Sequence, residues 1–182
     1  MAQSRRVPRR IPRPRPALEP RSLRDLGLSY AARFATTRAK LIRYLLRKLD
    51  ERGWEGAVPA NPAAVADEFV TLGYIDDAAF ADTRASALTR RGFGPRRIGQ
   101  ALGQAGIEAP LREATVAAAG DGAFAAAVSL ARRRRFGPFG DGARDPAVRQ
   151  KQIAALLRAG HDYGHARRIV GAESVEMLDN EE

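Results

Sequence analysis

A short segment that occurs twice constrains the fold of this chain more than any other feature. Residues 90–95 read RRGFGP, and residues 133–138 read RRRFGP. Each copy follows an alanine-rich stretch that opens with a phenylalanine, Phe80 or Phe124, and precedes a stretch that ends in a Leu…Gly pattern. Self-similarity of this kind is typical of tandem repeats, here of roughly fifty residues each.

The apolar residues between the two tails recur at helical spacing. No stretch alternates between apolar and polar residues with period two, as a half-buried strand would. The sequence therefore predicts an all-α fold built from tandem three-helix units. We place the units at residues 22–77, 78–119 and 120–172, and we interpret the glycine-rich segment 137–145 as an insertion in the last one.

Several helix boundaries are marked by residues that cap helices. Asn61 followed by Pro62 predicts a helix start, and Asp76 predicts the next one. Gly94 followed by Pro95 predicts a third. Further helices are predicted over residues 29–52, as one long helix or two short ones, and over residues 112–119, 123–135, 146–159 and 163–170.

Four helices are expected to end in the same way, with an apolar residue, a glycine four positions later and then a further residue that packs back. This spacing is typical of a Schellman ending, in which the glycine adopts a left-handed backbone. The four endings are Leu49/Gly53/Trp54, Phe69/Gly73/Tyr74, Leu102/Gly106/Ile107 and, less closely, Leu156/Gly160/His161.

Helical periodicity also predicts the buried positions. Ile75 with Phe80, and Phe93 with Ile98, have the spacing of a hydrophobic staple across a helix start. We interpret the aromatic residues Trp54, Tyr74, Phe80 and Phe93 as core residues rather than as platforms that stack on bases. Other predicted core positions are Phe34, Leu41, Leu45, Leu49, Val65, Phe69 and Leu72.

Charge is distributed unevenly along the chain. The chain carries a net charge of +10. Residues 1–21 contain seven Arg and five Pro, which predicts a disordered basic arm. Residues 173–182 form an acidic tail without a basic residue. The positive charge that remains between the tails indicates a partner that carries phosphate or acidic groups.

Cysteine is absent, which excludes disulfides and thiolate metal sites and fits a reducing cytosol. The chain has no apolar run of the roughly 18 residues that span a bilayer, and its first residues lack the apolar segment of a signal peptide. We therefore expect a cytoplasmic protein that does not enter a membrane.

Two motifs resemble those of a known family. Residues 72–77, which read LGYIDD, are similar to the hallmark stretch of the RecX family, and residues 94–107 are similar to its second motif. The similarity extends over residues 29–170, and His161 departs from it because an aromatic residue is usual there. The motif positions that we interpret as structural are Leu72, Gly73, Tyr74, Asp76, Asp77, Phe80, Gly94, Pro95, Ile98, Leu102 and Gly106.

The resemblance implies a function that acts by binding. RecX proteins modulate the RecA recombinase, so it implies a curved, elongated stack of repeats that lies in the groove of the RecA–DNA filament. It also implies inhibition of strand exchange and of the linked ATPase and co-protease activities in DNA repair and the SOS response. We expect a monomer that binds RecA filaments, binds single-stranded or duplex DNA directly but more weakly, and needs no cofactor.

Two arginine clusters beside the repeated segment are candidate contacts for RecA carboxylates or DNA phosphates. Adjacent arginines repel one another, a cost that an acidic partner relieves, although a solvated basic face is the alternative. Because the clusters have equivalent places in successive repeats, we expect them one repeat apart on the same side of the stack. The candidates are Arg90, Arg91, Arg96 and Arg97, then Arg132, Arg133, Arg134 and Arg135, and, as an extension, Lys151, Arg158, Arg167 and Arg168.

Two further groups admit a chemical role but are better explained by structure. Asp76 and Asp77 near Glu68 resemble paired carboxylates, yet both aspartates also suit a helix start. His161 and His165 are four residues apart, like two ligands on one helix face, but no further ligand has convincing spacing. We therefore predict neither a catalytic site nor a metal site.

The main alternative function is a helical DNA-binding protein that acts without RecA. In that case one three-helix unit would work as a helix-turn-helix, with Arg96 and Arg97 in a groove. Against it, no segment has the Asn, Gln and Arg pattern of a base-reading helix. An enzyme or a bare structural adaptor is the remaining alternative.

Overall fold

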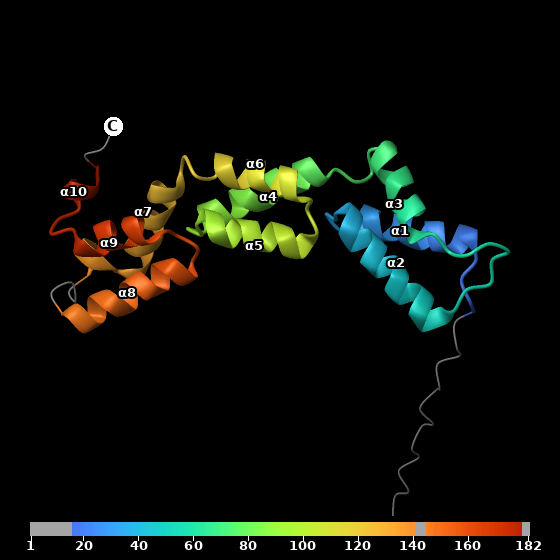
Figure 1. Cartoon of the computed structure of the whole chain (residues 1–182), viewed down its shortest axis with the longest axis horizontal. Coiled ribbons are helices and arrows are strands. Elements are labelled where there is room, and N and C mark those ends of the chain that lie inside the picture. Colours follow the sequence, from blue (N-terminus) through green and yellow to red (C-terminus); the bar gives the residue numbers. More distant parts are fainter. Residues whose placement is uncertain (1–15, 141–144, 180–182) are drawn as a thin grey trace, which may run out of the picture.

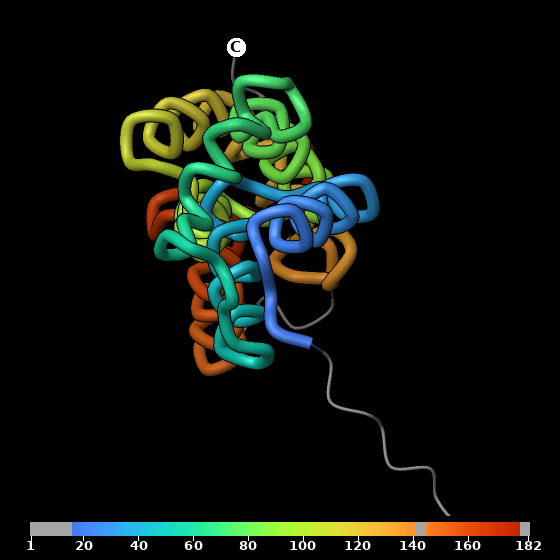
Figure 2. Tube along the Cα trace, turned by 90° about the vertical axis from the view of Figure 1, so that its right-hand side faces the viewer, coloured from blue at the N-terminus to red at the C-terminus, as the bar shows by residue number. Residues whose placement is uncertain are grey.

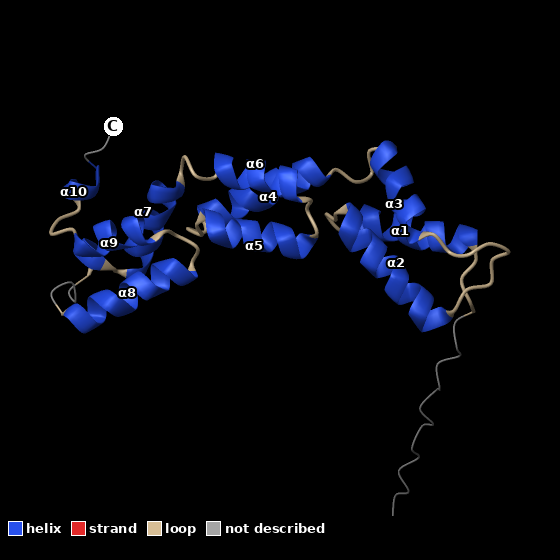
Figure 3. Ribbon diagram, in the orientation of Figure 1, coloured by secondary structure: helices blue, strands red, loops and turns tan. Residues whose placement is uncertain are grey.

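The computed structural model describes residues 16–140 and 145–179. Within these ranges the chain forms ten α-helices and one short 3-10 helix, and no strand (Figure 3). The predicted all-α class is confirmed. The helices are α1 (Pro20–Arg33), α2 (Arg38–Arg52), α3 (Pro62–Thr71), α4 (Asp77–Arg90), α5 (Pro95–Ala105), α6 (Ala109–Ala118), α7 (Ala123–Arg134), η1 (Gly137–Phe139), α8 (Pro146–Arg158), α9 (Tyr163–Gly171) and α10 (Glu176–Asp179).

The helices are grouped in three repeats that follow one another in space as they do in the sequence. Helices α1–α3 form the first repeat, α4–α6 the second and α7–α9 the third, in an elongated, arched row (Figure 1). Figure 2, which looks along this row, shows the repeats one behind another. The predicted stack of three-helix units is confirmed.

Each repeat has its own apolar core. Leu41, Leu45 and Phe69 are fully buried in the first repeat, and Ile98 and Leu102 are fully buried in the second. The third repeat has two smaller clusters. The Phe93 ring packs against the apolar clusters of both the second and the third repeat, so these two repeats are packed against each other.

The predicted helix starts are confirmed by their caps. The Asn61 side chain accepts a hydrogen bond from the Ala64 N–H at 3.0 Å, and Asp76 Oδ1 accepts one from the Ala79 N–H at 2.8 Å. Gly94 precedes the first residue of α5 in an extended conformation. Each cap satisfies or positions N–H groups that have no partner within their own helix.

Three of the four predicted Schellman endings are confirmed. In each, a glycine with a positive φ is followed by a residue whose N–H donates to the carbonyl five positions earlier. The bonds are Tyr74 to Phe69, Ile107 to Leu102 and His161 to Leu156, at 2.9, 3.1 and 3.2 Å. The fourth differs, because Gly53 has a ψ of 179° and leads the chain into a bridge between Trp54 and Leu18.

The middle helices of the three repeats are joined end to end. At the joint between α8 and α5, the Gly94 N–H donates to the Ala159 carbonyl at 2.9 Å, and the Arg96 N–H donates to the Gly160 carbonyl at 3.2 Å. Between α5 and α2, the Thr37 hydroxyl donates to the carbonyl of the last residue of α5 at 2.6 Å. Each joint places helix-end carbonyls against helix-start donors, an arrangement that the helix dipoles favour.

The predicted basic arm extends too far along the chain. Leu18 is fully buried, its N–H donates to the Gly53 carbonyl at 3.0 Å, and α1 already begins at Pro20. Residues 16–21 are therefore part of the first repeat, and residues 1–15 of the arm lie outside the described residues. Of the two alternatives predicted over residues 29–52, the structure has two helices, and the first of them starts nine residues earlier than predicted.

Three predicted core positions are wrong. Phe34, Leu72 and Tyr74 are 57%, 50% and 53% exposed. Phe34 and Leu72 follow the last residues of α1 and α3, where the chain leaves the packed face. The rings of Tyr74 and Phe69 lie edge to face, at 5.7 Å between ring centroids, and this contact leaves about half of Tyr74 accessible.

Two smaller expectations also change. Ile75 is buried in the core of the first repeat, whereas Phe80 borders the core of the second, so the pair does not close a single staple. The predicted acidic tail includes α10, in which Leu178 is buried against the third repeat. Residues 180–182 lie outside the described residues.

Candidate functional site at an arginine-lined pocket

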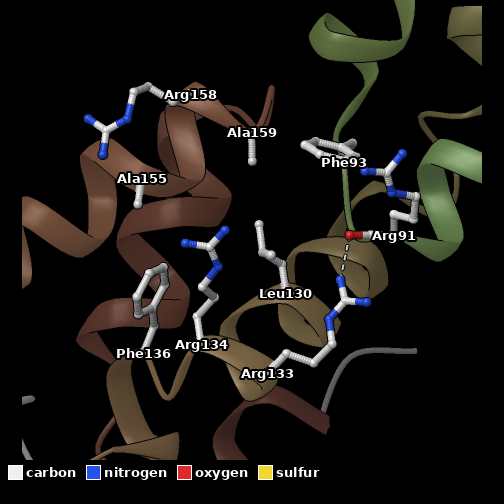
Figure 4. A pocket seen from close by; sticks show the side chains of 9 residues that line it. All are labelled: Arg91, Phe93, Leu130, Arg133, Arg134, Phe136, Ala155, Arg158 and Ala159. Carbon is white, nitrogen blue, oxygen red and sulfur yellow. Dashed lines mark hydrogen bonds between the residues drawn. The ribbon is translucent and has the colours of Figure 1, made fainter. Parts of the chain in front are cut away.

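An arginine-lined pocket of about 530 Å³ opens at the junction of the second and third repeats. Its apolar wall comes from Phe93, Leu130, Phe136, Ala155 and Ala159 (Figure 4). Four cations line it as well, and no acidic residue does so among the described residues. They are Arg91, Arg133, Arg134 and Arg158. We call this site the arginine pocket.

The two copies of the repeated segment build opposite sides of the arginine pocket. Arg91 lies at the end of α4, and Arg133 and Arg134 lie in the last turn of α7. The two arginine clusters therefore meet at one site, and the expectation that they lie one repeat apart is wrong. The reason is the joint between α8 and α5, which brings the end of α4 against the end of α7.

Arg133 has a structural role inside the arginine pocket. Its guanidinium donates to the main-chain carbonyls of Arg91 and, at 3.5 Å, of Arg90 (Figure 4). These hydrogen bonds connect the third repeat to the second. Arg134 instead extends between Phe136 and Leu130 toward the open pocket, where its charge is available to a ligand.

The remaining residues of the two clusters lie around the arginine pocket. Arg132 lies over the Phe139 ring, at 5.1 Å from its centroid, and Arg135 caps α7 with a left-handed backbone. Arg97 donates to the Gln100 side chain at 3.3 Å and lines a smaller hollow next to the pocket. Arg90 lines a different hollow, together with Asp82 and Thr115, and Arg96 is exposed.

The predicted extension of the basic surface is only partly brought together. Arg158 lines the arginine pocket, and Lys151 is exposed on the same helix. Arg167 and Arg168 line a separate hollow of about 870 Å³ between α8, α9 and α10. The Arg168 guanidinium lies 4.5 Å from the centroid of the Phe124 ring. These two arginines therefore belong to another face of the third repeat.

The three carboxylates considered as an acid/base group serve three different contacts. Asp76 caps its own helix, and Asp77 Oδ1 accepts a hydrogen bond from the Arg38 N–H at 2.9 Å. Glu68 forms an ion pair with Arg24 at 2.6 Å, and this hydrogen-bonded guanidinium lowers the pKa of Glu68. Each carboxylate holds structure in place, as the sequence interpretation favoured.

The two histidines also have separate partners. His161 is fully buried, and its Nε2 lies 3.0 Å from the Gly92 carbonyl. Because a carbonyl only accepts, Nε2 carries the proton. Burial lowers the pKa of His161. His165 Nδ1 lies 2.7 Å from Asp162. Among the described residues, no three His, Asp or Glu side chains gather in a way that would hold a metal ion.

Sequence reasoning did not identify two further cations that line hollows outside the arginine pocket. Arg84 lines the small hollow beside the arginine pocket, and Lys40 lines a larger one between the first and second repeats. Neither residue lies in a charge cluster of the sequence, so charge patterning alone carries no signal for them.

In the described ranges no single helix is long and apolar enough to cross a bilayer. One pair of helices, Ala109–Ala118 with Ala123–Phe139, has that length and apolar composition only when taken together, and it is bent by 68°.

Comparisons with known proteins agree with the repeat architecture. Residues 76–116 match the family described as RecX, second three-helix domain. The chain is 34% identical over 167 residues to the regulatory protein RecX of Myxococcus xanthus, which covers 87% of this chain and 88% of that protein. It is 33% identical over 153 residues to the regulatory protein RecX of Halorhodospira halophila, with 83% and 88% coverage.

A solved structure has the same fold. The crystal structure of RecX from Lactobacillus salivarius superposes with a TM-score of 0.65 at 20% identity, and the match covers 87% of this chain and 96% of that one. The sequence similarity and the shared three-helix repeats lead to one conclusion. This chain belongs to the RecX family of regulatory proteins.

Proposed function

We propose that this protein binds the RecA–DNA filament and restrains RecA in recombination, ATP hydrolysis and co-protease activity. The observation that carries the proposal is the arginine pocket, which Arg91, Arg134 and Arg158 line without an acidic residue in the described lining. Concentrated guanidinium groups favour a partner with phosphate or carboxylate groups. A RecA filament on DNA offers both at regular intervals.

The proposed mechanism is occupancy. The elongated row of repeats bridges neighbouring RecA subunits and competes with DNA pairing and subunit exchange, so binding free energy alone produces the effect. We propose that the protein acts as a monomer in the cytoplasm, without a cofactor and without chemistry of its own. Membership of a family of regulatory proteins supports this reading.

The test compares two double variants that lose the same charge. Arg134→Ala/Arg158→Ala removes two pocket cations, and Arg21→Ala/Arg33→Ala removes two exposed cations elsewhere. Arg133 is left unchanged because it also connects two repeats. Each variant is pulled down on RecA–ATP filaments assembled on single-stranded DNA, and RecA-dependent ATP hydrolysis is measured in parallel.

The pocket variant should bind filaments at least about tenfold more weakly, since each charge-assisted contact contributes roughly 1.5–3 kcal/mol. ATP hydrolysis should recover in proportion, while the control variant behaves as wild type. Suppression of hydrolysis by the pocket variant at the wild-type concentration would exclude the pocket as the contact. Equal wild-type binding to naked duplex and to filaments would favour the alternative, a DNA-binding protein that acts without RecA.

A further inference from the structure

The arginine pocket adjoins two further hollows in a row that reaches the first repeat. The pocket shares Arg91 and Phe93 with the small hollow beside it. That hollow shares Arg84, Ala101 and Gln104 with the hollow of about 710 Å³ between the first and second repeats. The three hollows therefore adjoin in a row along α4 and α5, and we call this row the groove. The 14 residues of α4 give it a length of at least about 20 Å.

The groove is lined by cations from end to end. Among its described lining residues Asp76 is the single acid, and its carboxylate is already occupied as the cap of α4. Burial and the neighbouring Arg84 and Arg43 lower the pKa of Lys40, which reflects how closely positive charges are gathered there. The lining cations are Lys40, Arg84, Arg91, Arg97, Arg133, Arg134 and Arg158.

The end of the groove in the first repeat presents two accessible aromatic rings. Phe34 and Tyr74 line it and are 57% and 53% exposed. Each ring is supported by a second ring behind it, Phe34 by Tyr30 at 5.3 Å and Tyr74 by Phe69 at 5.7 Å between centroids. Exposed aromatic rings are costly to hydrate, and rings held in this way lose little freedom when a planar group stacks on them.

A groove that combines phosphate-binding cations with exposed aromatic rings has the chemistry of a single-strand nucleic-acid site. Cations follow the backbone, and every base offers a face for stacking. A duplex keeps its bases paired and leaves the rings without a partner. An acidic peptide would use the cations but has no repeated planar groups. A single nucleotide is too short to reach both the rings and the arginine pocket.

We propose that this groove binds an extended single strand of nucleic acid, with bases stacked on Phe34 and Tyr74 and phosphates held by the arginines toward the third repeat. The inference extends the proposed function and rests on it for the identity of the strand, because a RecA filament contains such a strand. Binding itself requires no RecA. Its test therefore uses the protein alone, so that its failure and failure of RecA binding are separate results.

The test measures fluorescence anisotropy of a labelled oligothymidylate of about twelve nucleotides, a length within the site sizes of single-strand binding folds. Three competitors are compared with it: an abasic oligonucleotide with the same number of phosphates, a duplex and polyglutamate. The full-length wild-type protein should bind the oligothymidylate more tightly than all three.

The aromatic variants identify the stacking platform. Tyr74→Ala and Phe34→Ala should each weaken oligothymidylate binding about tenfold and leave binding of the abasic strand unchanged. Tyr74→Trp should restore binding, because the larger ring still stacks. Leu46→Ala is the matched control, since Leu46 is 51% exposed and does not line the groove. Circular dichroism checks that each variant is folded.

Two outcomes overturn the proposal. Equal binding of the abasic strand and the oligothymidylate by wild type would reduce the groove to a general polyanion surface. Tighter binding of polyglutamate would assign it to an acidic protein segment. If the protein alone binds the strand as expected but does not suppress RecA, single-strand binding in the groove is confirmed and the proposed function is wrong.

Discussion

Arg135 occupies in the third repeat the helix-end position that Gly92 holds in the second. Both have a left-handed backbone, with φ of 55° and 76°. The hydrogen bond that follows is also the same, from Phe136 to Ala131 in one repeat and from Phe93 to the carbonyl five positions earlier in the other, at 2.9 and 3.0 Å. A side chain in this conformation costs roughly 1–2 kcal/mol, so the third repeat carries strain that the second avoids.

Replacing Arg135 by glycine should release this strain. We expect Arg135→Gly to raise the free energy of unfolding by up to about 1 kcal/mol, because the added flexibility of the unfolded chain offsets part of the gain. Urea denaturation measures the change. Gly92→Ala is the opposite test, since its Cβ would lie 2.5 Å from Arg133 Nη2 and 2.9 Å from Leu130 Cβ and should destabilise the protein. If the Arg135→Gly protein is less stable than wild type, the backbone at Arg135 is not strained.

The joint between the second and third repeats should fail when a methyl group is added. A Cβ at Gly94 would lie 2.5 Å from the Gly160 carbonyl group, with main-chain atoms on both sides. Gly94→Ala should therefore separate the repeats and produce a second, earlier unfolding transition in calorimetry. Gly171→Ala is the control, because a Cβ there meets nothing within 4 Å. A single transition at the wild-type temperature in both variants would show that the joint is not required.

Stability should fall in mildly acidic solution because of His161. Burial lowers its pKa in the folded protein below about 6.5, the value of an exposed histidine. The hydrogen bond to the Gly92 carbonyl opposes this lowering of the pKa, nearby His165 lowers the pKa further, and nearby Asp162 raises it. The unfolded chain therefore takes up this proton first, and stability decreases as the pH falls below about 6.5, until the pH reaches the folded-state pKa.

A second proton on this ring would also be unsatisfied, since Nδ1 of His161 is buried without a hydrogen-bond partner among the described residues. The melting temperature should drop between pH 7.5 and 5.5. In His161→Phe, which lacks the titrating group, the drop should be smaller. An equal drop in both proteins would assign the effect to other groups.

The boundary of the folded region is testable through Leu18. Leu18→Ala should cost about 2–5 kcal/mol of unfolding free energy, because the side chain is fully buried in the first core. Deletion of residues 1–21 should destabilise the first repeat at least as much. Deletion of residues 1–15 keeps this side chain and its contacts, so chemical denaturation of the two truncated proteins should give clearly different midpoints.

Local signals in the sequence were sufficient for most of the fold. Caps such as Asn61 and Asp76, and glycines such as Gly73 and Gly106, act within one helix turn, so their effect is readable without knowing the tertiary structure. A local signal also marks the break between α1 and α2, which would have decided between one helix and two. Thr37 caps α2, and its hydroxyl accepts from the Lys40 N–H at 3.1 Å.

The candidate site was harder to predict because it depends on how repeats meet. Arg91 and Arg134 were both candidates, but their shared pocket follows from the joint between α8 and α5. The hydrogen bonds of this joint are made by main-chain atoms, and its glycines, Gly94 and Gly160, are equally explained by helix boundaries. The exposure of Phe34 and Tyr74 was missed for a related reason. Periodicity places a residue on the apolar face of its helix, but it does not show where the neighbouring repeat stops covering that face.

Because α8, α5 and α2 are joined end to end, the length of this protein is the sum of the lengths of its repeats. The joint between α8 and α5 uses main-chain groups of the two helix termini, and the joint between α5 and α2 adds the Thr37 hydroxyl at the helix start. Duplication of one repeat within the gene would lengthen the row by about 16 Å, the length of a helix such as α5, and leave the cores on either side intact. A change in the number of repeats during evolution would thus change the length over which such a protein contacts its partner.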